Sequence, residues 1–401
     1  MRRQIERKTF MEWLDFWRDK PIIKVITGIR RCGKTTLLEL YRQKLLSEGV
    51  DERQIVSVNF EDPDLGEFAA FRDAWTFIRA KMDDTLPRTY VFLDEVQRVP
   101  DFEKLVDGLF VKKNVDVYIT GSNAKFLSGE LATFLTGRYV EIAMQTLSFA
   151  EYRPLFPELE TGRAFNDFMR FGGFPFAASL VGEPHAHSDY LGAILNTILY
   201  KDVVARVGLR DTTLLDRLVR FLFDSIGSPL SVNRIVGAFK AEGINIQNRT
   251  VDAHVDALCE SFLFHKVRRY NVKGKAILKT NCKYYAADTG LRRVAVGDRA
   301  GDWGHILENV VFLELRRRHK DVFMGAVGER EVDFVAFENA QPRYFQVALT
   351  VRDPATLERE LRPLQAIPDQ YPKTLLTLDP DPPMDCNGIR QLCVTDFLLG
   401  K

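Results

Sequence analysis

One stretch decides the fold of the first part of the chain: Ile22-Ile23-Lys24-Val25-Ile26-Thr27-Gly28-Ile29-Arg30-Arg31-Cys32-Gly33-Lys34-Thr35. Its apolar, β-branched first half is typical of a buried strand, and its second half matches the pattern G-x-x-x-x-G-K-[ST]. Residues 35–46 follow with helical spacing of their apolar side chains. A strand, a glycine-containing loop and a helix in this order form the context in which the pattern binds phosphate.

The loop is expected to bind the phosphates of a nucleoside triphosphate. Its glycines let backbone N–H groups wrap the phosphates, and the positive end of the helix dipole adds attraction. Lys34 adds a point charge, and the Thr35 hydroxyl is expected to bind Mg²⁺. The predicted nucleotide-binding residues are Gly28, Ile29, Arg30, Arg31, Cys32, Gly33, Lys34, Thr35 and Thr36.

A second apolar run, residues 90–93, ends in two carboxylates, Asp94 and Glu95. At the carboxyl end of a strand, Asp94 is expected to hold Mg²⁺ together with Thr35. Glu95 is expected to orient and deprotonate an attacking water, which turns a nucleotide binder into a hydrolase. ATP and Mg²⁺ are therefore the predicted cofactors.

Two further polar residues are candidates for contact with the γ-phosphate. Asn123 follows a strand-like run over residues 115–119 and would lie beside the phosphate if that strand neighbours the one carrying Asp94. Alternatively, Asn123 caps the following helix. Arg138 is a candidate arginine finger, acting in cis or from a neighbouring subunit, or else an ordinary surface arginine.

The first 148 residues alternate strand-like and helix-like segments. Strand-like runs cover residues 22–26, 55–60, 90–93 and 115–119, and helical spacing covers residues 35–46, 66–82 and 102–112. This alternation predicts an α/β domain in which helices cover both faces of a parallel sheet.

Composition and charge place the chain among ordinary globular proteins. Its 401 residues predict two or three domains, and 46% of them are hydrophobic. The net charge of +1 provides no overall attraction to nucleic acid or to a membrane. The first twenty residues are too charged for a signal peptide, and no run approaches a membrane span, so we expect a cytoplasmic protein without a membrane partner.

The pattern changes after residue 148. Residues 149–225 are typical of a helical linker or lid region. Residues 226–295 have the order helix, helix, basic hairpin, which predicts a winged helix-turn-helix. Residues 296–401 return to a small mixed α/β domain.

Several strings outside the phosphate loop support a resemblance that covers nearly the whole chain. They are Leu147-Ser148-Phe149-Ala150-Glu151-Tyr152, Gly172-Gly173-Phe174-Pro175, Lys201-Asp202, Lys283-Tyr284-Tyr285-Ala286-Ala287-Asp288-Thr289-Gly290-Leu291, Leu307-Glu308-Asn309 and Glu331-Val332-Asp333-Phe334. The sequence resembles the bacterial and archaeal AAA-type P-loop ATPases that carry a C-terminal domain of unknown function. The resemblance implies an AAA-type ATPase domain, a winged helix and a terminal domain related to the PD-(D/E)-x-K nucleases. It implies no substrate.

A nuclease of that type needs acidic groups for Mg²⁺ and a lysine that helps to activate water. Glu308, Asp333 and Gln346 occupy the acidic positions, and Ala348 stands where the lysine is expected. Because Gln346 carries no charge and no lysine flanks this strand, we expect a catalytically degenerate site unless a remote lysine enters it.

The winged-helix region is locally basic. Residues 231–293 contain 12 Lys and Arg against 5 Asp and Glu. The residues predicted to contact DNA or RNA phosphates are Arg268, Arg269, Lys273, Lys275 and Lys279. The preceding helix presents Asp252, Asp256 and Glu260 on one face, which repel phosphates, so packing or oligomerisation is the alternative role.

The sequence therefore predicts a Mg²⁺-dependent ATPase whose nucleotide state rearranges its domains. One alternative is a slow-turnover, ATP-gated regulatory switch that uses the basic hairpin, and a weaker one is an ATP-dependent nuclease. A homo-oligomer and a protein client stay open as partners.

Overall fold

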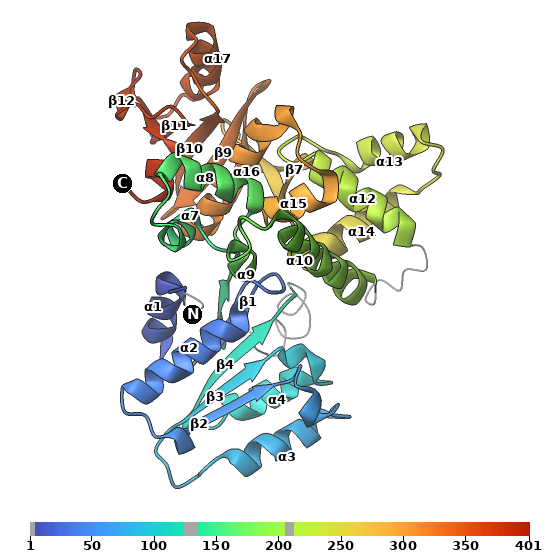
Figure 1. Cartoon of the computed structure of the whole chain (residues 1–401), viewed down its shortest axis with the longest axis vertical. Helices are drawn as coiled ribbons and strands as arrows, with labels where there is room; N and C mark the ends of the chain where they lie inside the picture. The colour runs from blue at the N-terminus through green and yellow to red at the C-terminus, as the bar shows by residue number, and fades with distance from the viewer. Residues whose placement is uncertain (1–4, 124–134, 136, 205–211) are drawn as a thin grey trace. The chain divides into compact units, whose positions relative to one another are not determined.

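The computed structural model describes residues 5–123, 135, 137–204 and 212–401. The chain divides into two compact units, which are described separately below. The first comprises residues 1–144 with 260–262, and the second comprises residues 145–259 with 263–401. Figure 1 labels many of their helices and strands.

The first unit is built around a parallel sheet. Its described strands are β1 (Ile23–Thr27), β2 (Ile55–Asn59), β3 (Thr89–Asp94), β4 (Val115–Gly121) and β5 (Tyr139–Ala143). They lie in the order β2-β3-β4-β1-β5, and every neighbouring pair is parallel. The predicted P-loop type of α/β fold is confirmed, and β5 is an addition that the sequence patterns did not indicate.

Helices cover both faces of this sheet (Figure 1). The described elements are α1 (Lys8–Trp17), α2 (Lys34–Ser47), η1 (Glu52–Gln54), η2 (Pro63–Leu65), α3 (Phe71–Lys81), η3 (Val96–Arg98) and α4 (Phe102–Phe110). On one face Phe92 and Tyr118 stack, with ring centroids 4.8 Å apart, and Tyr118 contacts Tyr41 of α2. On the other face Leu93 and Ile119 belong to a core that includes residues of α3 and α4.

The second unit begins with helices, as the sequence predicts for residues 149–225. The described ones are α7 (Phe149–Tyr152), η4 (Arg153–Leu155), α8 (Thr161–Phe171), α9 (Pro175–Ala178), α10 (Pro184–Thr197), η5 (Ile198–Val204) and α12 (Thr212–Asp224). The predicted order of two helices and a hairpin follows as α13 (Val232–Ala241), α14 (Asn248–Glu260), β6 (Phe264–Asn271) and β7 (Ala276–Ala286).

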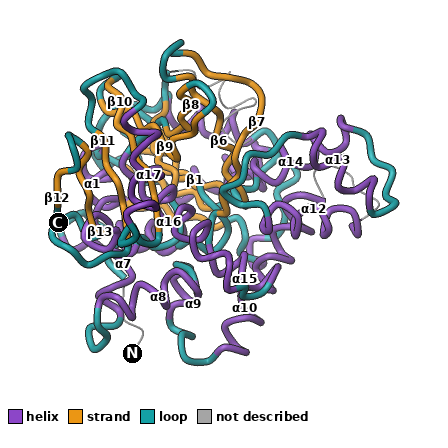
Figure 2. The backbone as a smooth tube through the Cα atoms, turned by 90° about the horizontal axis from the view of Figure 1, so that it is seen from above, coloured by secondary structure: helices purple, strands orange, loops and turns teal. Residues whose placement is uncertain are grey.

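The hairpin is part of a larger sheet. The remaining described elements are α15 (Thr289–Val296), η6 (Ala300–Asp302), α16 (Trp303–Arg318), β8 (Val322–Val327), β9 (Arg330–Glu338), β10 (Gln341–Ala348), α17 (Pro354–Gln365), β11 (Lys373–Thr377), β12 (Met384–Asp385), β13 (Ile389–Cys393) and α18 (Val394–Leu398). Among the described residues the strands form one sheet in the order β12-β13-β11-β10-β9-β8-β6-β7, which Figure 2 shows from above.

The boundary that the sequence suggested between residues 295 and 296 therefore falls inside one folded unit. Strand β6 pairs in parallel with β8, and Arg269 stands opposite Met324 in the register. Helix α16 is the centre of this unit, because every residue from Ile306 to Leu315 is buried. The hairpin and the strands of residues 296–401 therefore share one sheet.

Candidate functional site

The phosphate-binding loop connects β1 to α2 in the way its sequence predicts. Gly33 precedes Lys34, the first residue of the helix, and has a φ of 108°, in the region that favours glycine. Gly28 has a φ of 148°, and a Cβ atom added there would lie 2.0 Å from the carbonyl oxygen of Met144. Both glycines are therefore required by the backbone path.

The other predicted loop residues differ in their exposure. Ile29 and Cys32 are buried, whereas Arg31, Thr35 and Thr36 are exposed. Burial raises the pKa of the Cys32 thiol, so this side chain contributes packing and not a reactive thiolate. The loop thus offers mainly backbone groups, and Lys34 and Thr35 are its side chains that contact the polar residues of the neighbouring strands.

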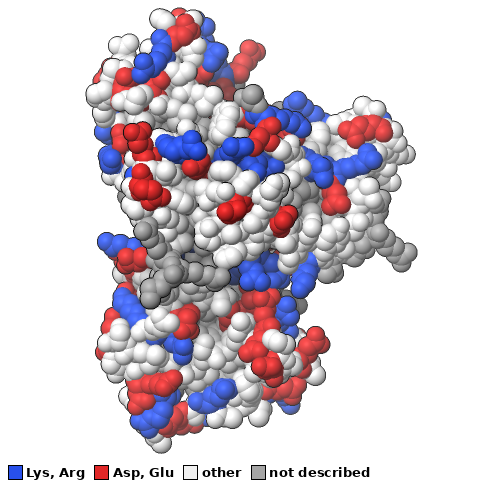
Figure 3. Space-filling view, in the orientation of Figure 1, with Lys and Arg blue, Asp and Glu red and all other residues white. Residues whose placement is uncertain are grey.

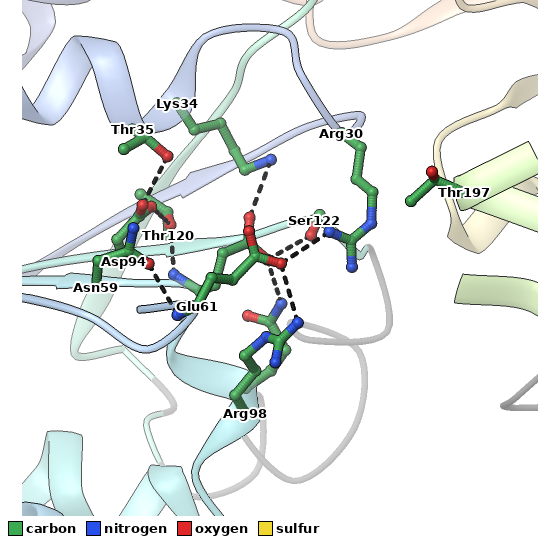
Figure 4. A network of polar contacts seen from close by, with 12 residues as sticks. Arg30, Lys34, Thr35, Asn59, Glu61, Asp94, Arg98, Thr120, Ser122 and Thr197 are labelled. Carbon is green, nitrogen blue, oxygen red and sulfur yellow. Dashed lines mark hydrogen bonds and ion pairs between the residues drawn. The ribbon is translucent and has the colours of Figure 1, made fainter. Parts of the chain in front are cut away.

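The charged pair at the centre of the site joins Lys34 to Glu95. The Lys34 Nζ atom lies 3.4 Å from Glu95 Oε1 and donates a hydrogen bond of 3.1 Å to the Gly28 carbonyl. Glu95 Oε2 accepts hydrogen bonds of 2.5 Å from Ser122 Oγ and 2.6 Å from Gln97 Nε2. Figure 4 labels Lys34 and Ser122 within this network of polar contacts. Both Lys34 and Glu95 are buried, so the pair is shielded from water.

Beside this pair lies a second polar group. Thr35 Oγ1 donates a hydrogen bond of 2.6 Å to Asp94 Oδ2, and Thr120 Oγ1 donates to the other oxygen of the same carboxylate. The Thr120 oxygen also accepts the Glu95 N–H at 2.9 Å. Burial raises the pKa of Asp94. The sequence patterns predicted Asp94 and Thr35 but missed Thr120 and Ser122.

Strand order explains the position of Asn123. Strand β4 lies between β3, which ends in Asp94, and β1, which leads into the loop. Asn123 follows β4 by two residues and is half-buried at the carboxyl-terminal end of the strands, where Asp94 also lies. The condition set for a γ-phosphate contact, that the two strands are neighbours, is met.

Arg138 lies at the amino-terminal end of the parallel strands, whereas the phosphate-binding loop lies at their carboxyl-terminal end. The prediction that Arg138 is an arginine finger acting in cis is therefore wrong. It precedes β5, and the Ile23 N–H at the start of β1 donates to the Arg138 carbonyl at 2.9 Å. Because parallel strands share their direction, the loop at the far end of β1 is about 15 Å away along the strand. The Arg138 guanidinium forms a 2.5 Å ion pair with Asp107 instead.

A network that sequence reasoning missed connects the loop to the segment after β3. Arg30 Nη1 lies 3.0 Å from Glu61 Oε1, and Arg98 Nη2 lies 3.1 Å from the same oxygen (Figure 4). Burial alone would raise the pKa of Glu61, but the two guanidinium groups hold it below its usual value. Glu61 follows the carboxyl end of β2, which is the available signal in the sequence.

The residues that the sequence predicts for a degenerate nuclease site lie close together in the second unit, with one addition. The Asp333 N–H donates to Gln346 Oε1 at 3.3 Å, and Glu308 of α16 lies 2.8 Å from Lys283 Nζ. The sequence provided no lysine beside β10, but Lys283 of β7 supplies one because the hairpin belongs to this sheet. Burial alone would lower the pKa of Lys283, and the carboxylates around it raise it above its usual value.

The basic hairpin is only partly free for phosphates. Arg268, Lys273 and Lys275 are exposed, Arg269 is half-buried beside β8, and the Lys279 side chain lies outside the described residues. At the base of the hairpin Lys266 pairs with Asp256 of the acidic helix face at 3.3 Å. On the face shown in Figure 3, basic and acidic side chains are interspersed.

Asp288 joins two of the segments that support the family resemblance, residues 172–175 and 283–291. Its carboxylate accepts the Gly173 N–H at 2.7 Å and the Gly290 N–H at 2.8 Å, and it caps α15. A Cβ atom on Gly172 would lie 2.0 Å from the same carboxylate. Burial raises the pKa of Asp288 to about 6. These two segments therefore pack against each other.

No helix in the described part of the chain is long and apolar enough to cross a membrane.

Comparisons with known proteins define the class. A family model described as an AAA domain matches residues 20–153, and one described as a domain of unknown function (DUF8612) matches residues 162–301. The solved Walker-type ATPase PABY2304 of Pyrococcus abyssi is 14% identical, with a TM-score of 0.50, over 73% of this chain and 96% of that chain. The first unit is therefore a P-loop domain of the AAA type.

Two relatives are similar over most of the chain. An uncharacterised protein of Haemophilus influenzae is 36% identical over 98% of this chain and 98% of its own length. The uncharacterised protein MJ1544 of Methanocaldococcus jannaschii is 29% identical over 85% of this chain and 77% of its own. The chain belongs to the family of the Haemophilus influenzae protein.

Proposed function

We propose that the protein is a Mg²⁺-dependent ATPase that converts ATP to ADP and phosphate and couples its nucleotide state to the arrangement of its domains. The observation that carries this proposal is the pairing of Lys34 with Glu95 beside the Thr35–Asp94 hydrogen bond. A cation, a base and two oxygen ligands then stand at one edge of the sheet, next to a phosphate-binding loop.

The residues fit the metal that this chemistry needs. The Thr35 hydroxyl and the Asp94 carboxylate are hard oxygen ligands, 2.6 Å apart, and would hold Mg²⁺. When bound, Mg²⁺ supplies neutralisation of phosphate charge. The backbone N–H groups of residues 28–36 and the Lys34 ammonium would bind the β- and γ-phosphates.

Phosphate binding and base activation are linked through Lys34. A phosphate that attracts Lys34 weakens its ion pair with Glu95, while Ser122 and Gln97 continue to hold the Glu95 carboxylate. Glu95 then accepts a proton from water as the water oxygen bonds to the γ-phosphorus. The bond between that phosphorus and the β–γ bridging oxygen breaks, and ADP leaves.

The alternative is an ATP-gated switch with slow turnover that contacts DNA or RNA. Its support is the exposure of Arg268, Lys273 and Lys275 on the hairpin. Hydrolysis measured with duplex DNA, single-stranded DNA or RNA separates the two. A rate that rises with nucleic acid and falls again with salt supports a contact through the hairpin. If none of the three nucleic acids changes the rate of hydrolysis, a protein client is the favoured partner.

Arg138 is proposed to act only from a neighbouring subunit of a homo-oligomer, since it lies far from the loop of its own chain. Mixing Arg138→Ala protein with Lys34→Ala protein tests this. If the arginine acts in trans, mixed assemblies regain hydrolysis, because the intact loop of one subunit meets the intact arginine of another. Subunit exchange without recovered hydrolysis rejects the trans role.

A further inference from the structure

A buried cluster in the second unit surrounds the ammonium group of Lys283. Its Nζ atom lies 2.6 Å from Glu331 Oε1, 2.8 Å from Glu308 Oε1 and 3.7 Å from Asp333 Oδ1. Only 3% of the Lys283 side chain is exposed, and Tyr285 donates a 2.5 Å hydrogen bond to the same Glu308 oxygen. One cation thus faces three carboxylates.

The cluster joins three elements. Lys283 comes from β7, and Glu308 comes from the central helix α16. Glu331 and Asp333 lie two residues apart on β9, so their side chains point to the same face of the sheet. The ammonium group therefore ties the hairpin to the helix and to the strand that the nuclease-like region contributes.

While Lys283 is in place, the metal implied by the nuclease resemblance does not fit these residues. A divalent cation would need anionic oxygens at the positions of Glu308, Asp333 and Gln346, but Gln346 is neutral. Its Nε2 atom donates to Glu360 at 3.0 Å, and its Oε1 atom accepts the Asp333 N–H at 3.3 Å. The second Asp333 oxygen accepts the Val347 N–H at 2.9 Å. The space between the Glu308 and Asp333 carboxylates is occupied by the ammonium group.

We propose that Lys283 is a built-in cation that takes the place of the divalent metal in this nuclease-like fold. The positive charge which a metal would bring is supplied by the chain itself, so the second unit folds without metal and does not cleave nucleic acid. Glu308, Glu331 and Asp333 hold the ammonium group, and once that group is removed the same three carboxylates are expected to bind a divalent cation.

The test removes the ammonium group and offers a metal in its place. Two proteins are compared without nucleotide: a parent in which Lys283 is intact, and the same protein with Lys283→Ala. Both carry Asp94→Asn, which removes the carboxylate ligand proposed for Mg²⁺ in the first unit. In EDTA, Lys283→Ala is expected to melt about 6–12 °C lower than its parent, because three carboxylates are left without their buried partner. Mn²⁺ is expected to restore the melting temperature of this variant in a saturable manner and to leave the parent unchanged.

A matched control comes from the same hairpin. Lys266 pairs with Asp256 at an exposed position, so Lys266→Ala is expected to change the melting temperature by about 2 °C or less, with or without Mn²⁺. If Lys283→Ala does not fold, Lys283→Gln, which keeps an N–H donor, takes its place.

Three results overturn the proposal. One is a Lys283 variant that melts as high as its parent, or that is destabilised without any recovery in Mn²⁺. Another is tight Mn²⁺ binding to the parent protein with Lys283 intact, measured by electron paramagnetic resonance. The third is Mn²⁺-dependent nicking of DNA by the native chain that Asp333→Ala abolishes, since it would mean that Lys283 serves catalysis beside a bound metal.

Discussion

The carboxyl group of Asp288 gives a prediction with a defined sign and size. It is buried and is held by the N–H groups of Gly173 and Gly290, and burial raises its pKa to about 6 from an ordinary value of 3.8. The folded state therefore binds a proton more tightly than the unfolded state does. Below pH 3.8 both states are protonated, and above pH 6 both are ionised, so the effect is confined to that window.

Within this window the free energy of unfolding falls as the pH rises. The difference between the two pKa values corresponds to a loss of about 3 kcal/mol between pH 3.8 and pH 6, with no further change above it. Asp288→Asn removes the titrating group, so the native protein should lose about this much stability relative to the variant as the pH rises. The variant also loses an accepting oxygen, but that loss shifts its stability equally at every pH.

Urea unfolding from pH 3.5 to 7 measures this difference. Trp303 is the one tryptophan of the second unit in the sequence, so ¹⁹F NMR of fluorotryptophan-labelled protein reports on the unit that contains Asp288. Asp353→Asn is the control, because Asp353 caps α17 at an exposed position and its pKa is lowered. Its contribution therefore grows with pH instead of falling. If the stability difference between the native protein and Asp288→Asn is independent of pH, burial does not raise the pKa of Asp288.

Two further predictions concern the nucleotide site. Gly28→Ala should abolish ATP binding, measured by calorimetry, because its Cβ atom would lie 2.0 Å from the Met144 carbonyl and displace the loop; unchanged affinity would contradict the loop geometry. Ser122→Ala should lower kcat about tenfold with little change in KM, because the Ser122 hydroxyl donates a hydrogen bond to Glu95, the proposed base; a rise in KM at constant kcat would assign it to binding instead.

Much of the first unit could be predicted because its signals are local. The motif at residues 28–35 fixes a strand before it and a helix after it, and the buried central strands are short apolar runs. Parallel pairing of β3 and β4 then places Asp94 and Asn123 together at the carboxyl-terminal end of the strands. Strand β5 escaped notice because it is an edge strand, and its half-exposed residues from Tyr139 to Ala143 make no apolar run.

The errors share one cause, which is pairing between distant segments. Arg138 has a suitable residue type, but strand direction places it at the wrong edge. Lys283 was absent from the nuclease-like interpretation because it precedes Asp333 by fifty residues. The lysine reaches the cluster only because β6 pairs with β8, and no local pattern in the sequence specifies that pairing.

Steady-state hydrolysis tests the proposed role of Glu95 as the base of an ATPase. Native protein, Glu95→Gln and Lys34→Ala are compared with Mg²⁺, and ATP affinity is measured for each. Glu95→Gln is expected to lower kcat by about 10²-fold or more while it keeps its affinity for ATP. Lys34→Ala should lose that affinity. Hydrolysis by Glu95→Gln at the native rate would show that Glu95 is not the base, and no hydrolysis by native protein above that of Lys34→Ala would show that the protein is not an ATPase.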